Sequence, residues 1–333
     1  MLTDLFLAAS GFEPTSLAEV IPPACRRPIA LAPRPVPVDG DVLVDLPAWT
    51  PRGAVSHLLP ALSILGADEY SYRFELSVHA AGAWSPWVGG AALGAVSFAP
   101  IPARAGALGA DIDVFLTTEP VEAVRLRLRL HGGDRQRLLT NRWFVSLSAS
   151  DGVVEASAAR PAPGRVSLDV PPRSQMEEDE TIRHRICSPT SVAMVLEYLG
   201  ARADTRALAT AMFHAGLDLY GVWPAAIRAA GRHGVVGYLL RFPDWAAAAW
   251  CLAARLPIIA SVRYAAGELT GAAMPETAGH LLVLVGYDGD RVLVNDPAAP
   301  DRRSVKRAYR LDELERVWLA RSGVGYVLFR PPV

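Results

Sequence analysis

The sequence predicts an α+β chain in two parts: an all-β, sandwich-like region, then a region in which helices pack on a mostly antiparallel sheet. Its length of 333 residues suits two domains, and 51% apolar against 20% charged residues suffices for a core in each. Apolar and polar residues alternate in the first half, whereas a helical period begins after Val166. These observations predict that the two halves differ in class.

The first half contains four short runs in which apolar and polar side chains alternate, as in strands with one face in water. They cover residues 70–79, 112–116, 124–130 and 143–147. Stretches rich in Gly and Pro separate them, so we expect an antiparallel sandwich over residues 31–150. Residues 1–30 form an N-terminal extension without a defined role. Residues 151–165 are small, polar and Pro-containing, which is typical of a linker.

The second half, residues 166–333, begins with helical patterns and ends with strands. From Pro189 to Gly200, apolar residues recur on one helical face, with Pro at the first helical position and Gly at the C-terminal cap. Further helices are predicted at residues 204–215, 224–232 and 244–255, and strands at residues 235–241, 257–264, 279–287, 291–295 and 323–329. Helices followed by strands predict an α+β domain.

The charge balance excludes several classes of partner. Lys and Arg number 33 against 34 Asp and Glu, and a net charge of −1 argues against a nucleic-acid or anionic-membrane binder. No apolar run reaches the ~18 residues of a membrane span. The three cysteines lie far apart and fit neither a disulfide framework nor a zinc site, so we expect no metal and no cofactor.

The start of the chain favours a cytoplasmic location. Residues 1–11 are apolar but include Asp4, and no basic leader precedes them, so they make a poor signal peptide. A misassigned start codon would make secretion the alternative.

Cys187 is the first candidate catalytic residue. It stands where the chain enters the helix predicted at Pro189, and the free N–H groups and positive dipole end of a helix N-terminus favour a thiolate. The thiolate is the nucleophilic form of cysteine. The alternative is a structural cysteine, because free cysteines are commonly buried.

A cysteine nucleophile needs a base, and His280 opens one of the predicted strands. The sequence Asp288–Asp290 predicts a hairpin with the next strand. With a three-residue loop, Asp296 lies on the same sheet face as His280 and diagonal to it, within side-chain reach. With a two-residue loop, Asn295 takes this place and Asp296 points to the other face. The residue that orients the imidazole is therefore Asp296, with Asn295 as the alternative.

Four segments share a pattern with a known group of enzymes: Leu168 to Gln175, Cys187–Ser191, Gly279–His280 and Asn295–Pro297. Together they resemble a papain-like cysteine peptidase. In particular, they resemble the bacteriocin-processing (double-glycine leader) peptidases, the thirty-ninth family of cysteine peptidases, and their standalone bacterial relatives. The resemblance runs from Val166 to the C-terminus, about half of the chain.

The resemblance implies a papain-like α+β domain over residues 166–333 and a role for each candidate. It makes Gln175 the oxyanion-hole residue, Cys187 the nucleophile, His280 the base and Asp296 the third triad member. Two features depart from the family pattern. Ser188 stands where leader peptidases often have Gly, and bacteriocin export is not expected because this sequence has no spanning helix.

The segment Tyr220–Pro224 is also similar to that of the standalone relatives. Tyr220 and Trp223 within it are candidates for the substrate cleft, with packing at a helix entry as the alternative. The acidic run Glu177–Glu180 either favours basic substrates or is a solvated loop.

The predicted function is hydrolysis of peptide or amide bonds through a thioester, with a peptide or protein as substrate. One alternative is acyl transfer on the same site. The other is an inactive papain-like binding protein whose β domain holds a glycan or a protein. Trp84 and Trp87 are candidates for such a ligand site, although large aromatic residues more often anchor turns in a core.

Overall fold

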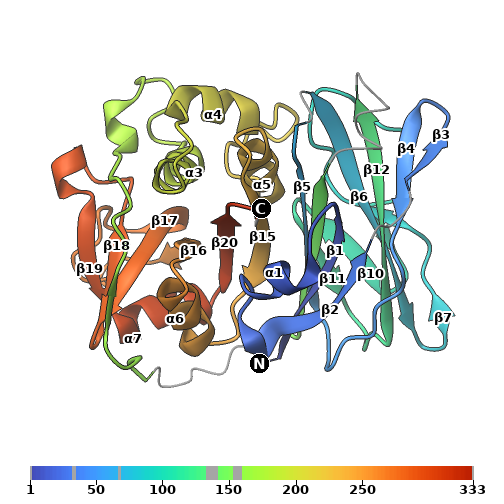
Figure 1. The fold of residues 1–333 in the computed structure, drawn as a ribbon, viewed down its shortest axis with the longest axis horizontal. Coiled ribbons are helices and arrows are strands. Elements are labelled where there is room, and N and C mark those ends of the chain that lie inside the picture. The colour runs from blue at the N-terminus through green and yellow to red at the C-terminus, as the bar shows by residue number, and fades with distance from the viewer. Residues whose placement is uncertain (1, 32–34, 67–68, 133–141, 153–159, 332–333) are drawn as a thin grey trace.

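The computed structural model describes residues 2–31, 35–66, 69–132, 142–152 and 160–331. Two parts lie side by side in Figure 1: an N-terminal half of β-strands (residues 2–152) and a C-terminal half of helices around a sheet (residues 160–331). Mixed helices and an antiparallel sheet in the C-terminal half confirm the α+β class.

The strands of the N-terminal half form two sheets. The first has the order β2-β1-β13-β5-β11-β10-β9. Its strands are β1 (Thr3–Ser10), β2 (Arg26–Leu31), β5 (His57–Ile64), β9 (Arg104–Ala105), β10 (Leu108–Asp111), β11 (Val114–Thr117) and β13 (Trp143–Ser150). The second has the order β3-β4-β12-β6-β7, and β8 also pairs with β6. Its strands are β3 (Val36–Val38), β4 (Asp41–Asp45), β6 (Tyr70–Ala80), β7 (Ala83–Trp84), β8 (Val88–Gly89) and β12 (Ala123–Gly132).

The first residues of the chain are part of the first sheet rather than a separate extension. Strand β1 pairs with β13 along its whole length, and β2 continues the sheet as a parallel neighbour of β1. The short helices α1 (Pro14–Ala18) and η1 (Pro23–Cys25) connect these two strands. The boundary expected at residue 30 therefore falls at the end of a strand inside one sheet.

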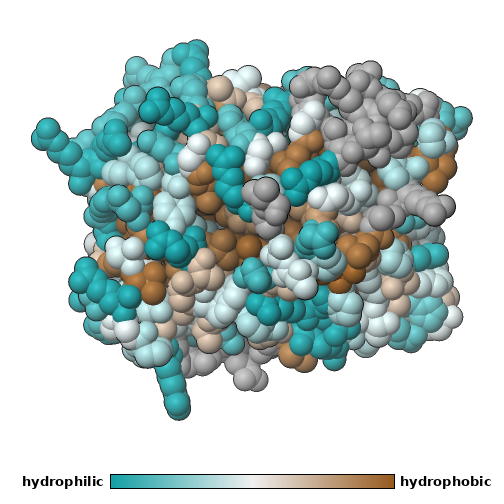
Figure 2. Space-filling model, viewed as in Figure 1, coloured by the Kyte–Doolittle hydropathy of each residue, from teal (hydrophilic) through white to brown (hydrophobic). Residues whose placement is uncertain are grey.

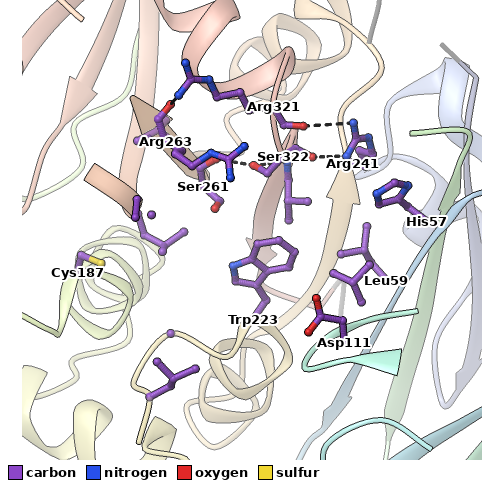
Figure 3. Close-up of a pocket in the computed structure, with 18 of the residues that line it drawn as sticks. His57, Leu59, Asp111, Cys187, Trp223, Arg241, Ser261, Arg263, Arg321 and Ser322 are labelled. Carbon is purple, nitrogen blue, oxygen red and sulfur yellow. Dashed lines mark hydrogen bonds between the residues drawn. The ribbon is translucent and has the colours of Figure 1, made fainter. Parts of the chain in front are cut away.

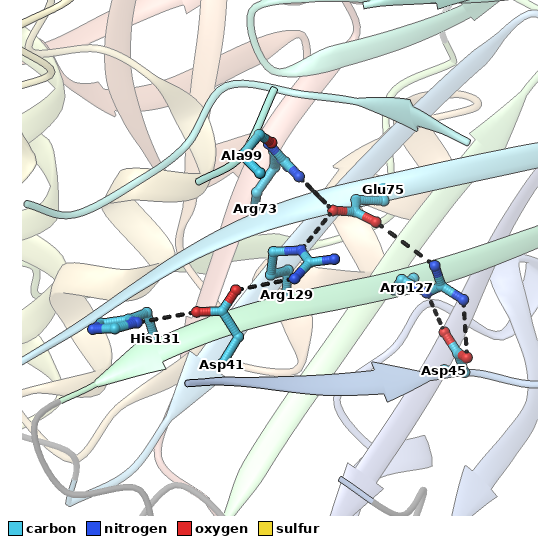
Figure 4. Close-up of polar contacts among 8 residues, drawn as sticks. All are labelled: Asp41, Asp45, Arg73, Glu75, Ala99, Arg127, Arg129 and His131. Carbon is cyan, nitrogen blue, oxygen red and sulfur yellow. Dashed lines mark hydrogen bonds and ion pairs between the residues drawn. The ribbon is translucent and has the colours of Figure 1, made fainter. Parts of the chain in front are cut away.

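Strand β6 has no face in water, contrary to the prediction. Its polar side chains are buried: Ser71, Arg73, Glu75 and Ser77. Glu75 accepts hydrogen bonds from Arg73 and Arg129 and lies 4.0 Å from Arg127, and Asp41 and Asp45 pair with the same row of arginines (Figure 4). Charges that are paired in this way can be covered by the rest of the chain.

The aromatic pair that was considered for ligand binding is partnered within this sheet. Trp84 lies under Arg125, whose guanidinium carbon is 3.8 Å from the ring centroid, and Trp87 lies 4.3 Å under that of Arg127. The run at residues 112–116 also differs from the prediction. Ile112 has φ +52° and forms the turn between β10 and β11, so only the end of that run is a strand.

The C-terminal half is built on one antiparallel sheet of order β15-β20-β16-β17-β18-β19, and β14 also pairs with β17. The strands are β14 (Arg165–Ser167), β15 (Val236–Arg241), β16 (Ile258–Tyr264), β17 (Thr277–Asp288), β18 (Arg291–Asn295), β19 (Lys306–Arg310) and β20 (Val324–Phe329). Helices α3, α4 and α5 lie above this sheet in Figure 1, and α6 and α7 lie below it.

The helices end close to the predicted residues. They are α3 (Cys187–Tyr198), α4 (Thr205–Met212), α5 (Trp223–Gly231), α6 (Trp245–Ala253) and α7 (Leu311–Leu314), with the short turns η2 (Gln175–Glu177), η3 (Arg302–Ser304) and η4 (Glu315–Leu319). Helix α3 begins at Cys187, two residues before the predicted start, so Pro189 lies within its first turn. The thiol is thus carried by the first helical residue.

The hairpin of β17 and β18 has the two-residue turn of one expected register and the bond between Asp296 and His280 that was expected of the other. Asp288 pairs with Arg291 across a two-residue turn. A bulge between Leu284 and Gly286 then shifts the register by one residue, so that Asn295 pairs with Val283. A bulge reverses the face to which later residues point, and it turns Asp296 toward His280.

The two halves share one continuous core. Strand β15 lies at the edge of its sheet and packs against the first sheet, where Ser63 and Ser148 accept hydrogen bonds from the backbone N–H groups of Gly237 and Arg241. The rings of Phe144 and Phe329 also meet there, 5.8 Å apart. Figure 2 shows apolar residues in brown along this boundary.

Candidate active site

Cys187 is half-buried at the start of α3 and lines a cavity. Its pKa is lowered. Burial alone would raise it, but hydrogen bonding to His280, the charge of that imidazole and the backbone N–H groups of Leu281 and Ser188 outweigh burial. The other cysteines, Cys25 and Cys251, are fully buried, and burial raises their pKa values. Cys187 is therefore the one of the three poised to be a thiolate.

His280 lies on β17 and is 2% exposed. Its Nε2 is 2.8 Å from Oδ1 of Asp296, which leaves Nδ1 for the thiol. Burial would lower its pKa, but the charge and hydrogen bond of Asp296, together with those of Cys187, raise it above the usual value. A lowered thiol pKa beside a raised imidazole pKa favours a thiolate–imidazolium pair.

Asp296 follows β18 and is fully buried. Besides His280, it accepts hydrogen bonds from the backbone N–H of Ala298 (3.0 Å) and from the hydroxyl of Tyr309 (2.7 Å). Burial would raise its pKa, but His280 and these donors lower it. The carboxylate thus keeps its charge and can steady a charged imidazole.

Tyr309 is a site residue that the sequence analysis did not find. It lies on β19, which was not predicted because Lys306–Arg310 contains a single large apolar side chain among four short or charged ones. The alternation that leaves Lys306 and Arg310 exposed and Tyr309 buried is the signal that could have revealed it.

Asn295 bonds outside the group formed by Cys187, His280 and Asp296. Its side-chain amide donates to the carbonyl of Val170, 2.9 Å away, and ties the segment before Gln175 to the sheet. The bulge in the hairpin decides this difference between Asn295 and Asp296.

Gln175 lies in η2 and is buried, but it is not part of the cavity wall. Its backbone N–H donates to the carbonyl of Pro297, next to Asp296, and its side-chain amide donates to the carbonyl of Arg183, 2.7 Å away. One amide hydrogen remains beyond that bond. Gln175 therefore connects the turn after Asp296 to the loop that leads to Cys187.

The cavity beside Cys187 has a volume of about 720 Å³, within the range of ligand-binding pockets. Tyr220 and Trp223 line it, as does Gly279, which precedes His280. Figure 3 shows Trp223 between Cys187 and the N-terminal half. The acidic run Glu177–Glu180 does not line it.

The N-terminal half supplies the opposite wall of the same cavity. These residues come from β5 and from the β10–β11 hairpin: His57, Leu59, Asp111, Val114 and Leu116. The two halves are also joined at the cavity edge, where Asp113 accepts a hydrogen bond from the backbone N–H of Trp223 (2.8 Å). The candidate site therefore lies between the halves.

Two other properties were searched over the described part of the chain. No helix there is long and apolar enough to cross a membrane. No group of three or more His, Cys, Asp and Glu side chains within the same residues is arranged to hold a metal ion.

Residues 167–326 match the model of the Peptidase_C39 like family. One similar solved structure is described as a C39-like peptidase from Bacillus anthracis. It is 18% identical with a TM-score of 0.38, and the match covers 50% of this chain and 97% of that chain. Another is the peptidase domain of Streptococcus ComA, a bi-functional ABC transporter of a quorum-sensing pathway, at 13% identity and a TM-score of 0.33, covering 48% and 98%.

No curated protein matches this chain. The family match spans just under half of the sequence and contains Cys187, His280 and Asp296. On this match, residues 167–326 are similar to the Peptidase_C39 like family.

Proposed function

We propose that the protein is a cysteine-type peptidase or amidase that works through Cys187, His280 and Asp296. The observation that carries this proposal is the row of hydrogen bonds from Cys187 through His280 to Asp296, beside a cavity large enough for a peptide segment. A nucleophile, a base within hydrogen-bond reach and a third group that orients the base are what acyl transfer to cysteine requires.

In the first half-reaction, the thiolate of Cys187 attacks the carbonyl carbon of the substrate and forms a C–S bond. The imidazolium of His280 then gives its Nδ1 proton to the amine as the C–N bond breaks, which leaves a thioester. In the second half-reaction, neutral His280 takes a proton from water, and the hydroxide adds to the thioester. Breakage of the C–S bond releases the carboxylic acid and restores the thiolate of Cys187 beside the imidazolium of His280.

The developing oxyanion needs hydrogen-bond donors. We assign this role to the backbone N–H of Cys187, at the free end of α3, and to the remaining amide hydrogen of Gln175. The bonds of Gln175 to Arg183 and Pro297 support this role, because they hold the glutamine in one orientation. Gln175→Ala tests it by removing the donor.

A second candidate function is acyl transfer, in which an amine instead of water attacks the thioester. The cavity volume of about 720 Å³ favours it, because this space can hold an acceptor beside the thioester. Incubation with an added amine separates the two, since a transferase yields the amide of that amine as the main product.

We also infer that the N-terminal half is a sandwich-like accessory domain of the peptidase. Two sheets of seven and six strands support this inference, as does their contribution of one wall to the cavity. The accessory domain then acts in substrate recognition at the cleft rather than as a separate ligand-binding module.

The experiment that tests the proposed function is alkylation of the three cysteines by iodoacetamide, followed by mass spectrometry from pH 5 to pH 9. We expect Cys187 to react well below the free-thiol pKa of about 8.5 and His280→Ala to lose at least about tenfold of the rate at pH 6. Cys25 and Cys251 are internal controls because both are buried. A Cys187 rate that does not respond to His280→Ala would contradict the proposal.

A further inference from the structure

The lining of the cavity is rich in arginine. Among the described residues that line it, Asp111 is the single acidic side chain, whereas four are arginines: Arg185, Arg241, Arg263 and Arg321. Figure 3 shows Arg263 and Arg321 on one side and Asp111 on the other. The charge of the cleft is therefore unevenly distributed.

Two of these arginines are neutralised by acids outside the cavity wall. Arg185 pairs with Asp218 at 2.9 Å. Arg321 pairs with both carboxylate oxygens of Glu268, at 2.7 and 2.6 Å, and donates to the carbonyl of Arg263. These pairs fix the two side chains but remove most of their net charge from the cleft.

Arg241 has a different set of partners. Its guanidinium donates to three backbone carbonyls, of Ser322, Gly152 and Arg321, and its Nε is buried without a partner among the described residues. The side chain is 5% exposed. The carbonyls orient the guanidinium without neutralising it, and Asp151 is the acid that acts on it electrostatically.

Arg263 is the free cation of this wall. It is exposed on β16, directly after Val262, which pairs with His280. In the described part of the chain, no acidic side chain lies within ion-pair distance of its guanidinium. Arg263 lines the same cavity as Cys187, so this cation faces the space in which a substrate of the thiol would lie.

We propose that the Arg263 side of the cleft, where Arg321 lies beside Arg263, is a subsite for a carboxylate of the substrate. This inference rests on the proposed function and names its substrate class: peptides that carry a carboxylate near the scissile bond. Guanidinium groups match carboxylates with paired, charge-assisted hydrogen bonds. Asp111 on the opposite wall repels the same group, which sets the direction in which the substrate lies.

The carboxylate has two sources, an acidic side chain or the C-terminus of the substrate, and peptide pairs distinguish them. We would compare kcat/KM for amidated peptides with Glu, Gln or Lys at each position near the scissile bond, and for free and amidated C-termini. The proteins are wild type, Arg263→Gln, Arg263→Glu and, as a matched control, Arg206→Gln on the exposed face of α4.

We expect wild type to prefer one carboxylate form about tenfold, as a charge-assisted hydrogen bond allows. The ratio falls to about threefold or less in Arg263→Gln and reverses toward Lys-containing peptides in Arg263→Glu, whereas Arg206→Gln keeps the wild-type ratio. A wild-type enzyme indifferent to every carboxylate, or a ratio that Arg263→Gln leaves unchanged, would overturn the subsite.

If no peptide is cleaved, the proposed function fails, and the subsite is still measurable on the thiol. The rate of Cys187 alkylation by anionic iodoacetate is divided by the rate with neutral iodoacetamide. We expect this ratio to fall about threefold in Arg263→Gln at low salt and to stay constant in Arg206→Gln, because only the former removes a cation from the lining of the cavity beside Cys187. An unchanged ratio in Arg263→Gln would contradict the subsite by itself.

Discussion

Asp296 is fully buried, and the residues around it stabilise its negative charge there. Such a charge is costly to bury unless it is paired and hydrogen-bonded. The pairing comes from His280, and the remaining acceptor capacity is taken by the Ala298 backbone and the Tyr309 hydroxyl. Tyr309 therefore acts on the thiol through two intermediate groups, as a positioning residue.

Tyr309→Phe removes one of these donors and keeps the ring. Asp296 then stabilises the charged imidazole less well, so the pKa of His280 falls and that of Cys187 rises. We expect kcat/KM, or the alkylation rate of Cys187 at pH 6, to drop about three- to tenfold. This is less than the full worth of a charge-assisted hydrogen bond, because the effect reaches the thiol through Asp296 and His280. The acid limb of the pH profile moves to higher pH, and a pH titration of the rate measures this shift.

Tyr198→Phe is the control, because its hydroxyl bonds the carbonyl of Arg255 outside the site. A rate that drops in Tyr309→Phe without movement of the acid limb would mean that the hydroxyl serves only packing.

The three residues proposed as the triad were candidates from the sequence alone, but their geometry could not be predicted. Cys187 and His280 stand at the starts of a helix and a strand, positions that periodicity reveals. The choice between Asn295 and Asp296 depends on a bulge at Val285. The adjacent Gly286 is a local sign of irregularity, but a glycine in a strand can equally mark the close approach of another backbone. Tyr309 could not be predicted as a site residue, because β19, which carries it, is too polar to be recognised as a strand.

At the scale of elements, α5 begins without a cap of its own. No side chain of its N-terminal segment caps it, and the acceptor for the backbone N–H of Trp223 is Asp113 in the other half. This bond also fixes the segment with Tyr220 and Trp223 at the cavity. Burial raises the pKa of Asp113 to about 6, against which the Trp223 N–H acts only in part.

This raised pKa predicts a pH-dependent stability. The folded state binds the proton of Asp113 more tightly than the unfolded state, so its stabilising effect is complete below about pH 4 and is lost as the pH rises through about 6. Asp113→Asn stays neutral and avoids this loss. We expect its free energy of unfolding, relative to wild type, to increase by up to about 3 kcal/mol between pH 4 and pH 7.

Urea unfolding of both proteins at pH 4, 5, 6 and 7 measures the difference. Asp290→Asn, in the exposed β17–β18 turn, is the control and should follow wild type. A constant difference between Asp113→Asn and wild type at all four pH values would show that Asp113 titrates normally.

Helices and strands with a strong periodicity could be predicted from the sequence. The burial of a strand's polar face by another part of the chain could not. Most predicted helices and strands of the C-terminal half lie within two residues of the observed bounds. In the N-terminal half, the serines of β13 alternate with apolar residues and indicate a face in water. Ser146, Ser148 and Ser150 are instead buried, because that face packs against the other half. Alternation shows that a strand has two faces, but not what covers the polar one.

At the scale of the whole molecule, the halves are joined by polar bonds as well as by the common core. Arg228 of α5 is 6% exposed and donates twice to the carbonyl of Tyr70, at 3.2 and 2.7 Å, while its guanidinium lies 5.2 Å from the centre of the Tyr70 ring. The hydroxyl of Tyr72 returns a bond to the carbonyl of Pro224. Interfaces of this kind couple the unfolding of their parts.

We therefore expect the two halves to unfold as one cooperative unit. Arg228→Ala leaves the carbonyl of Tyr70 buried without a donor and should cost about 2 kcal/mol. Native-state hydrogen exchange measures the loss of stability separately in β12 of the N-terminal half and in β17 of the C-terminal half. The loss of protection should be equal in both strands. Arg232→Ala, which removes the exposed pair with Glu69, should cost less than about 1 kcal/mol. A loss of protection confined to one half would mean that the halves fold independently and that the cleft between them can open without unfolding either.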